Sequence, residues 1–145
     1  APGGDLPRFT PNGSSWGVQA KEYLQDVRAL LYVRHREGAS GEAIVRAYTG
    51  AVDHVVTTFY AGASADYSER HNRLDQRLTV IAQGGYGRGE MNPCSDVDLL
   101  FLYPRRLDPY VETVYEKIFY ALIDTNLQVG HAVRSLKDCV NLAAE

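Results

Sequence analysis

The sequence predicts an α+β fold in which a helical segment precedes a small mixed β-sheet that carries helices on one side. Two observations predict it. Apolar residues recur at helical spacing through the first half of the chain, and short β-branched or apolar runs separated by glycine follow in the second half. The chain has 145 residues, enough for one compact core. We expect a flexible arm and a helical region over 1–76 and the sheet-containing core over 77–145.

The first half is expected to hold three helices. Apolar residues three and four apart predict the first over about 15–37, with Gly38 as the residue that ends it. Ser40 is a good N-cap for a second helix to about residue 60. Gly62-Ala63-Ser64 predicts a break before a third, polar helix that ends near residue 74. Residues 1–14 are rich in proline and glycine, which is typical of a flexible arm.

Three short runs in the second half predict strands. Residues 77–83 are rich in β-branched side chains and end at two glycines. Residues 97–103 form a nearly continuous apolar run, which suits a central strand covered on both faces. Residues 127–134 predict the third strand. Asp108 and Pro109 predict the start of a helix between the second and third strands, and Ser135 is a candidate cap for a final helix.

Composition and charge limit the classes of function. Hydrophobic residues make up 45% of the chain and the net charge is −3, so we expect a globular protein without the basic excess of most duplex-binding domains. We therefore expect no nucleic-acid partner. No apolar run reaches the ~20 residues of a membrane span, and no secretory leader is recognisable, so we expect no membrane association and a cytoplasmic location. Both ends look cut, which suggests a fragment of a longer multidomain protein.

The most informative segment is the glycine-rich run over 84–98. Four glycines in six positions follow a predicted strand, where bare backbone N–H groups suit phosphate oxygens. Arg88 adds a positive charge beside them. The run is not a P-loop, because it lacks the lysine, and Glu90 stands where a dinucleotide fingerprint needs its third glycine.

Asp96 and Asp98 follow at the mouth of the apolar run. Residues two apart on a strand share one face and lie ~6.6 Å apart along it. Two carboxylates so placed repel each other unless a cation lies between them, and Mg²⁺ prefers carboxylates together with substrate phosphates. Such a pair beside a phosphate-binding loop indicates phosphoryl or nucleotidyl transfer.

These residues resemble a known family. Gly84-Gly85 followed by Asp96-Val97-Asp98 is similar to the signature of DNA polymerase β-like nucleotidyltransferases. The longer string GGYGRGEMNPCSDVDLLFLY resembles the N-terminal nucleotidyltransferase domain of bacterial PII uridylyltransferase/uridylyl-removing enzymes. The segment 129–136, VGHAVRSL, is similar to the GHSVRT-type segment of the same family.

The resemblance implies a nucleotidyltransferase enzyme that moves a uridylyl group from UTP to a tyrosine of a PII nitrogen-regulatory protein and releases pyrophosphate. It implies that Asp96 and Asp98 are catalytic and bind Mg²⁺ or Mn²⁺. It also implies that Gly84, Gly85, Arg88 and Ser95 hold the triphosphate. In that family a hydrolytic HD domain and two ACT domains follow, so the chain would hold only the transferase core, and activity of the isolated fragment stays open.

One departure from the wider family bears on catalysis. Many relatives carry a third carboxylate on a later strand, and related adenylyltransferases read roughly V-D-x-R-L-R there, whereas this chain has Gly130 at the aspartate position. Either two carboxylates suffice, or a third ligand comes from His131 or from beyond residue 145. Two alternative functions remain open: transfer of another nucleotide or to another acceptor, and a catalytically inactive nucleotide-binding regulatory module.

Overall fold

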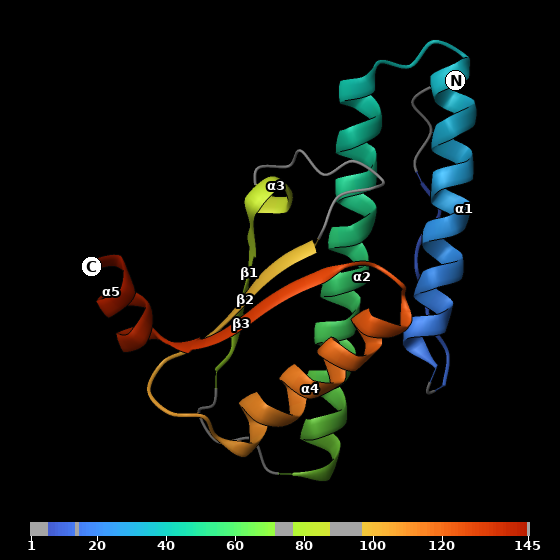
Figure 1. The fold of residues 1–145 in the computed structure, drawn as a ribbon. Coiled ribbons are helices and arrows are strands. Elements are labelled where there is room, and N and C mark those ends of the chain that lie inside the picture. Colours follow the sequence, from blue (N-terminus) through green and yellow to red (C-terminus); the bar gives the residue numbers. More distant parts are fainter. Residues whose placement is uncertain (1–5, 14, 72–76, 88–96, 145) are drawn as a thin grey trace.

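The computed structural model of the protein describes residues 6–13, 15–71, 77–87 and 97–144, and two long helices precede the strands, as the α+β prediction expects (Figure 1). The fold class is therefore confirmed. The bounds of the elements in chain order are α1 (Trp16–Arg36), α2 (Gly41–Arg70), β1 (Thr79–Gln83), α3 (Gly84–Gly87), β2 (Val97–Tyr103), α4 (Pro109–Asp124), β3 (Val129–Ser135) and α5 (Leu136–Ala144).

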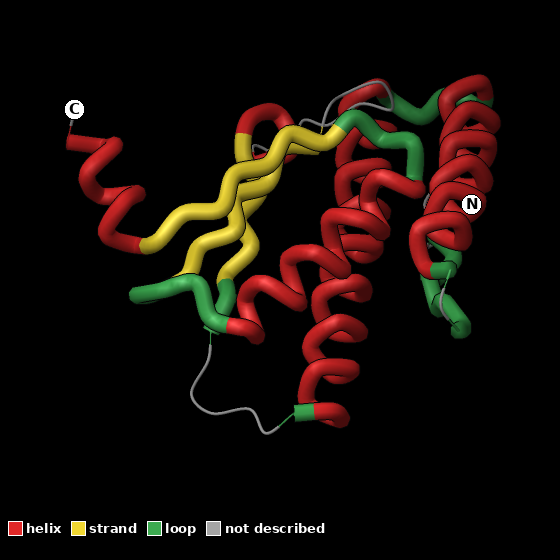
Figure 2. Tube along the Cα trace, turned by 60° about the horizontal axis from the view of Figure 1, so that its bottom comes forward, coloured by secondary structure: helices red, strands yellow, loops and turns green. Residues whose placement is uncertain are grey.

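The three strands form one mixed sheet in the order β1-β2-β3. β1 runs antiparallel to β2, with Gln83 opposite Asp98, and β3 runs parallel to β2, with Gly130 opposite Asp98. α4 makes the crossover that a parallel pair of strands needs. Figure 2 shows the strands side by side, with α2 and α4 on the same side and α5 beyond the end of β3.

The helices pack on one face of the sheet. Val97, Leu99 and Phe101 of β2 are at most 2% exposed and belong to the core shared with α2 and α4. On the opposite face Ile81 is 38% exposed. Leu100 of β2, on the same face as Ile81, is only 8% exposed although it lies outside the core cluster, so the expected cover of β2 on both faces stays a prediction. The apolar run includes Leu100 and Leu102, which lie on the second face, and a continuous run cannot reveal which face the helices take.

Several helix boundaries agree with the sequence-based prediction because local chemistry sets them. Gly38 follows α1 with a φ of 111°, a left-handed conformation that favours glycine. The Ser40 hydroxyl accepts a hydrogen bond from the Ala43 amide at 3.1 Å, and the Asp108 carboxylate accepts one from Val111 at 2.9 Å. The Ser135 hydroxyl accepts the Asp138 amide at 3.0 Å at the start of α5.

The predicted break at residues 62–64 is wrong, because α2 continues without interruption to Arg70. Gly62 lies inside the helix where the indole ring of Trp16 packs against it, and an added Cβ would stand 2.6 Å from that ring. Ser64 caps no helix, and its hydroxyl lies 3.0 Å from the Tyr110 hydroxyl of α4. Gly62 thus allows Trp16 to pack closely against α2. In the sequence alone, a glycine with this role cannot be told from one that ends a helix.

Residues 6–13 lie against the helices, although their composition predicts a flexible arm. Phe9 is buried beside Tyr23 and Phe59, and its amide donates to His54 Nε2 at 2.9 Å. A single hydrophobic cluster contains residues from both sides of the expected division at 76/77, so that division stays a prediction. Among the described helices, none combines the length and apolar content that a membrane crossing requires.

Candidate active site

Asp98 is the predicted metal ligand that the structure describes. It is the second residue of β2, and its neighbours Val97 and Leu99 are buried in the core on the helix face. Alternation along the strand therefore turns the half-buried Asp98 to the opposite face, as predicted. Within the described residues its carboxylate forms no hydrogen bond or ion pair.

Two glycines border this carboxylate. A Cβ added to Gly84 would stand 3.0 Å from Asp98 Oδ2, and one added to Gly130 would stand well under 3.0 Å from Oδ1. Gly84 belongs to the turn after β1, and Gly130 lies on β3 directly opposite Asp98. The carboxylate therefore sits in space that side chains at either position would fill.

The predicted phosphate-binding glycines begin in the single helical turn α3. Gly84 has a φ of 61°, which a residue with a Cβ adopts only under strain, and Gly85 is the second residue of the turn. Gly87 has a structural reason of its own, since a Cβ there would stand 2.5 Å from the Ala82 carbonyl oxygen. The turn consequently lies tightly against the end of β1.

Arg88, Ser95 and Asp96 lie outside the described residues. The expected pairing of Asp96 with Asp98 on one face thus stays a prediction, as do the phosphate contacts of Arg88 and Ser95. Among the residues that the structure describes, no group of three His, Cys, Asp or Glu side chains is placed to hold a metal ion.

His131, the alternative third ligand, is directed away from Asp98. It pairs with Leu99 rather than Asp98, so its side chain lies on the helix face of the sheet. Its Nδ1 lies 2.9 Å from the Tyr115 hydroxyl, and its ring packs edge-on against Phe119 at a centroid distance of 4.2 Å. Burial raises the pKa of Tyr115, with smaller contributions from Glu116 and Tyr120. The idea that His131 supplies a third ligand beside Asp98 is wrong.

Comparison with known proteins identifies the domain. A family model described as "Nucleotidyltransferase domain" matches residues 66–134, which include β1, β2, Asp98 and all but the last residue of β3. Residues 66–134 form a nucleotidyltransferase domain. The match identifies an enzyme domain of this type, and it agrees with the sequence motifs around Gly84 and Asp98.

Relatives of the nucleotidyltransferase domain carry a common name. A Caulobacter vibrioides protein named "Bifunctional uridylyltransferase/uridylyl-removing enzyme" is 40% identical over 126 residues, which are 86% of this chain and 13% of that protein. Proteins of the same name from Rhodospirillum rubrum and Rhodopseudomonas palustris are 41% identical over 125 residues and 52% identical over 85. The Rhodospirillum rubrum alignment covers 85% of this chain and 13% of that protein. The Rhodopseudomonas palustris alignment covers 59% of this chain and 9% of that protein. The chain thus spans about an eighth of the length of the first of these relatives.

Sequence reasoning missed one polar residue of the nucleotidyltransferase domain near Asp98. Gln83 is exposed at the end of β1 and stands directly opposite Asp98. Directly opposed residues of antiparallel strands share a face, with Cβ atoms about 4.5–5.5 Å apart. The row across the sheet is therefore Gln83, Asp98 and Gly130. Only the strand register reveals this row, since the three residues are distant in sequence.

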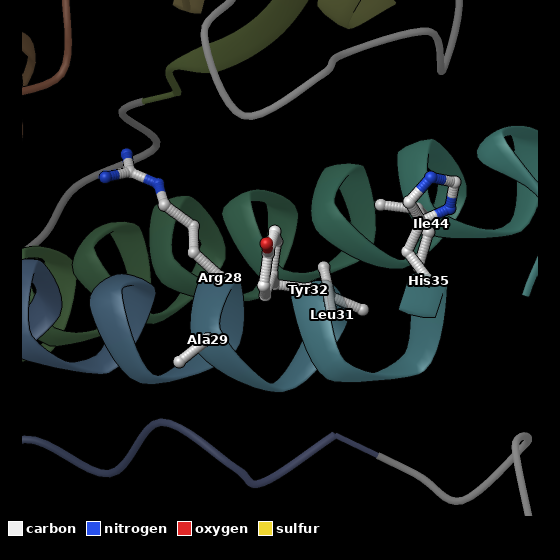
Figure 3. Close-up of a pocket in the computed structure, with 6 residues that line it drawn as sticks. All are labelled: Arg28, Ala29, Leu31, Tyr32, His35 and Ile44. Carbon is white, nitrogen blue, oxygen red and sulfur yellow. The ribbon is translucent and has the colours of Figure 1, made fainter. Parts of the chain in front are cut away.

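A cavity elsewhere in the chain has a different character. It has a volume of about 400 Å³, and its lining side chains come from α1 and the start of α2 (Figure 3). Its lining residues are Arg28, Ala29, Leu31, Tyr32, His35 and Ile44. None of the six is a carboxylate, so this cavity lacks the hard oxygen ligands that a nucleotide-bound metal requires.

Proposed function

We propose that the nucleotidyltransferase domain transfers a uridylyl group from metal-bound UTP to a tyrosine hydroxyl of a PII-type signalling protein. The observation that carries the proposal is Asp98, a half-buried carboxylate without a described partner beside the first glycine of the α3 turn. The printed name of the relatives supports uridylyl as the group transferred. UTP is a cytoplasmic metabolite, so a cytoplasmic location forms part of the proposal.

The residues at this end of the sheet fit a divalent cation. Asp98 offers a hard oxygen ligand on the face away from the helices, and Asp96 would add a second. Mg²⁺ or Mn²⁺ would neutralise the triphosphate and polarise the phosphorus that is attacked. Gly84 and Gly85 would bring backbone N–H groups to the triphosphate, and Ser95 and Arg88 would complete its binding.

The reaction is a substitution at the α-phosphorus. The acceptor tyrosine oxygen forms a new bond to that phosphorus and releases its proton to water. The bond from the α-phosphorus to the oxygen that bridges to the β-phosphate breaks, and pyrophosphate leaves with the electron pair. The residues of the domain contribute orientation and charge neutralisation, which provide most of the rate enhancement in this class of reaction.

Calorimetry tests the binding half of this proposal. UTP, ATP, GTP and CTP are titrated into the protein with Mg²⁺ and again with a chelator. We expect UTP to bind most tightly and only with Mg²⁺, because the Asp96 and Asp98 carboxylates otherwise repel the triphosphate. Equal affinity for UTP in chelator would contradict the metal role of these carboxylates. Tighter binding of another nucleotide would shift the proposal to that nucleotide.

One observation favours the second candidate, an inactive nucleotide-binding regulatory module. The β3 position opposite Asp98 carries Gly130 instead of a third carboxylate. The two candidates differ in product formation rather than in binding. Labelled UTP, Mg²⁺ and a PII-type acceptor are therefore incubated with the longer protein. Labelled acceptor supports the enzyme, and tight UTP binding without any labelling supports the module.

A further inference from the structure

We propose that Gly130 is a positioning residue for the Asp98 carboxylate, because the missing side chain on β3 leaves the space that this carboxylate occupies. The inference rests on the proposed function, since it assigns a purpose to the orientation of a metal ligand. On this inference, the glycine at 130 helps to form the site, and its role is more than the absence of a third carboxylate.

The geometry between the two residues is restrictive. Gly130 and Asp98 are direct partners in the parallel β2–β3 register. A Cβ on Gly130 would lie well under 3.0 Å from Asp98 Oδ1 and 3.5 Å from Cγ, and real Cβ atoms essentially never approach below 3.0 Å. Even alanine at 130 therefore requires the carboxylate to leave its present position.

Backbone conformation does not explain the glycine. The described glycines with positive φ are Gly13, Gly38 and Gly84, and Gly130 is not among them. An ordinary L-residue could adopt the backbone at 130. Glycine inside a strand weakens it, because it packs no side chain and loses more entropy on folding. The carboxylate of Asp98 is thus the feature that requires a bare position.

The strands cannot easily move apart to admit a side chain. β2 and β3 pair over seven residues, and the ladder begins with the Val97 amide donating to the Gln128 carbonyl oxygen at 2.8 Å. On the reverse face Leu99 and Phe101 are buried in the core. The Asp98 carboxylate is therefore the group that a side chain at 130 would displace.

This arrangement also predicts the effect of restoring a carboxylate. An aspartate at 130 would need the space that Asp98 now occupies, so both carboxylates could not keep the present geometry. Gly130→Asp should weaken metal binding rather than add a ligand.

A double-mutant cycle tests the contact without any metal. Chemical unfolding midpoints are measured for the parent, Gly130→Ala, Asp98→Ala and the double variant. We expect Gly130→Ala to lower the midpoint when Asp98 is present. In the Asp98→Ala background it should raise the midpoint, because the clash is gone and alanine reduces the entropy of the unfolded chain. The same shift in both backgrounds would overturn the inference.

Metal affinity provides the second test. Mn²⁺ alone is titrated into the parent, Gly130→Ala, Gly130→Asp and the control Gly50→Ala, whose added Cβ meets nothing within 4 Å. We expect both Gly130 variants to bind about 10- to 100-fold more weakly, the range for changes that disturb the orientation of a ligand, and the control to bind normally. Normal affinity in folded Gly130→Ala would overturn the inference.

An Asp98→Asn variant separates failure of this inference from failure of the proposed function. If Asp98→Asn abolishes Mn²⁺ binding while Gly130→Ala leaves it unchanged, only the positioning role of Gly130 is lost. If Asp98→Asn itself binds Mn²⁺ normally, the metal site of the proposed function is lost as well. Should Gly130→Ala unfold under the assay conditions, a folded double variant would show that Asp98 is the cause, and an unfolded double variant would overturn the inference.

Discussion

The Tyr115 hydroxyl of α4 lies 2.9 Å from Nδ1 of His131 on β3, within hydrogen-bonding distance. The imidazole therefore contacts the helices that cover the face of the sheet opposite to Asp98. Phe119 packs edge-on against the same ring. A histidine beside an Asp-x-Asp strand is an obvious candidate for a metal ligand when only the sequence is known. Here the alternation of the strand places it in a structural contact instead.

Replacement of His131 by phenylalanine tests that role. We expect Mn²⁺ and Mg-UTP affinities to stay at parent values, because the ring is on the wrong face to reach the cation. We expect stability to fall by at most about 0.5–1 kcal/mol, since the hydrogen bond to Tyr115 is lost at an exposed position. Tyr115→Phe removes the same bond from the other side and serves as the matched control. A tenfold loss of metal affinity in His131→Phe, with normal affinity in Tyr115→Phe, would show that His131 contributes to the metal site.

Asp98→Asn should abolish transfer while the fold is retained. The change removes a metal ligand and with it several kcal/mol of transition-state stabilisation. It also relieves any repulsion from Asp96, so the melting temperature should not fall. Transfer of label from UTP to a PII-type acceptor is measured in the longer protein, and melting is followed in parallel. Near-normal turnover would remove Asp98 from the catalytic centre.

Local chemistry explains which parts of the fold the sequence could predict. Ser40 and Asp108 form the caps expected of them, because a cap depends on residues within one helical turn. Gly38 and Gly62 look alike in sequence, yet one ends a helix and the other lies inside one. The difference arises from Trp16, which packs against Gly62 from another helix, and no local pattern contains that contact.

The same distinction applies to the candidate site. The position of Asp98 on the face away from the core follows from strand alternation, which is visible in the sequence. The relationship of Asp98 to Gly130 and Gln83 depends on strand order and register, and both are set by packing of the whole sheet. The sequence alone shows that residue 130 is not a carboxylate. The reason for a glycine there becomes apparent only when Asp98 is seen opposite it on the neighbouring strand.

Two glycines of α2 give a matched test of the contact with Trp16. Gly50→Ala should raise stability by about 0.5–1 kcal/mol, because alanine is the better helix former and its Cβ meets nothing within 4 Å. Gly62→Ala should lower stability, since its Cβ would stand 2.6 Å from the indole ring, which is stacked on Phe59 and cannot easily move. Chemical denaturation measures both variants. A stabilising Gly62→Ala would show that the ring adjusts freely.

The ion pair between Asp66 of α2 and Lys117 of α4 predicts a pH-dependent contribution to stability. The hydrogen bond from Lys117 lowers the pKa of Asp66, opposed by partial burial and assisted by the charges of Lys117 and Arg70. A lowered pKa means that the folded state favours the ionised carboxylate. The contribution is therefore complete above the unfolded-state pKa of about 3.9 and is lost as the pH falls through the lower folded-state value.

Asp66→Asn measures this contribution directly. The two side chains are 38% and 37% exposed, so screening by water limits the expected loss at pH 7 to about 0.2–1 kcal/mol. The difference from the parent should stay constant from pH 7 to about pH 5 and should vanish at lower pH, where Asp66 is protonated in both states. Urea unfolding at a series of pH values provides the measurement, with Asp26→Asn, an exposed residue of α1, as the control that should show no such loss. A deficit that persists unchanged at pH 2.5 would mean that the asparagine disturbs packing between α2 and α4, and that the charge of Asp66 is not what stabilises the pair.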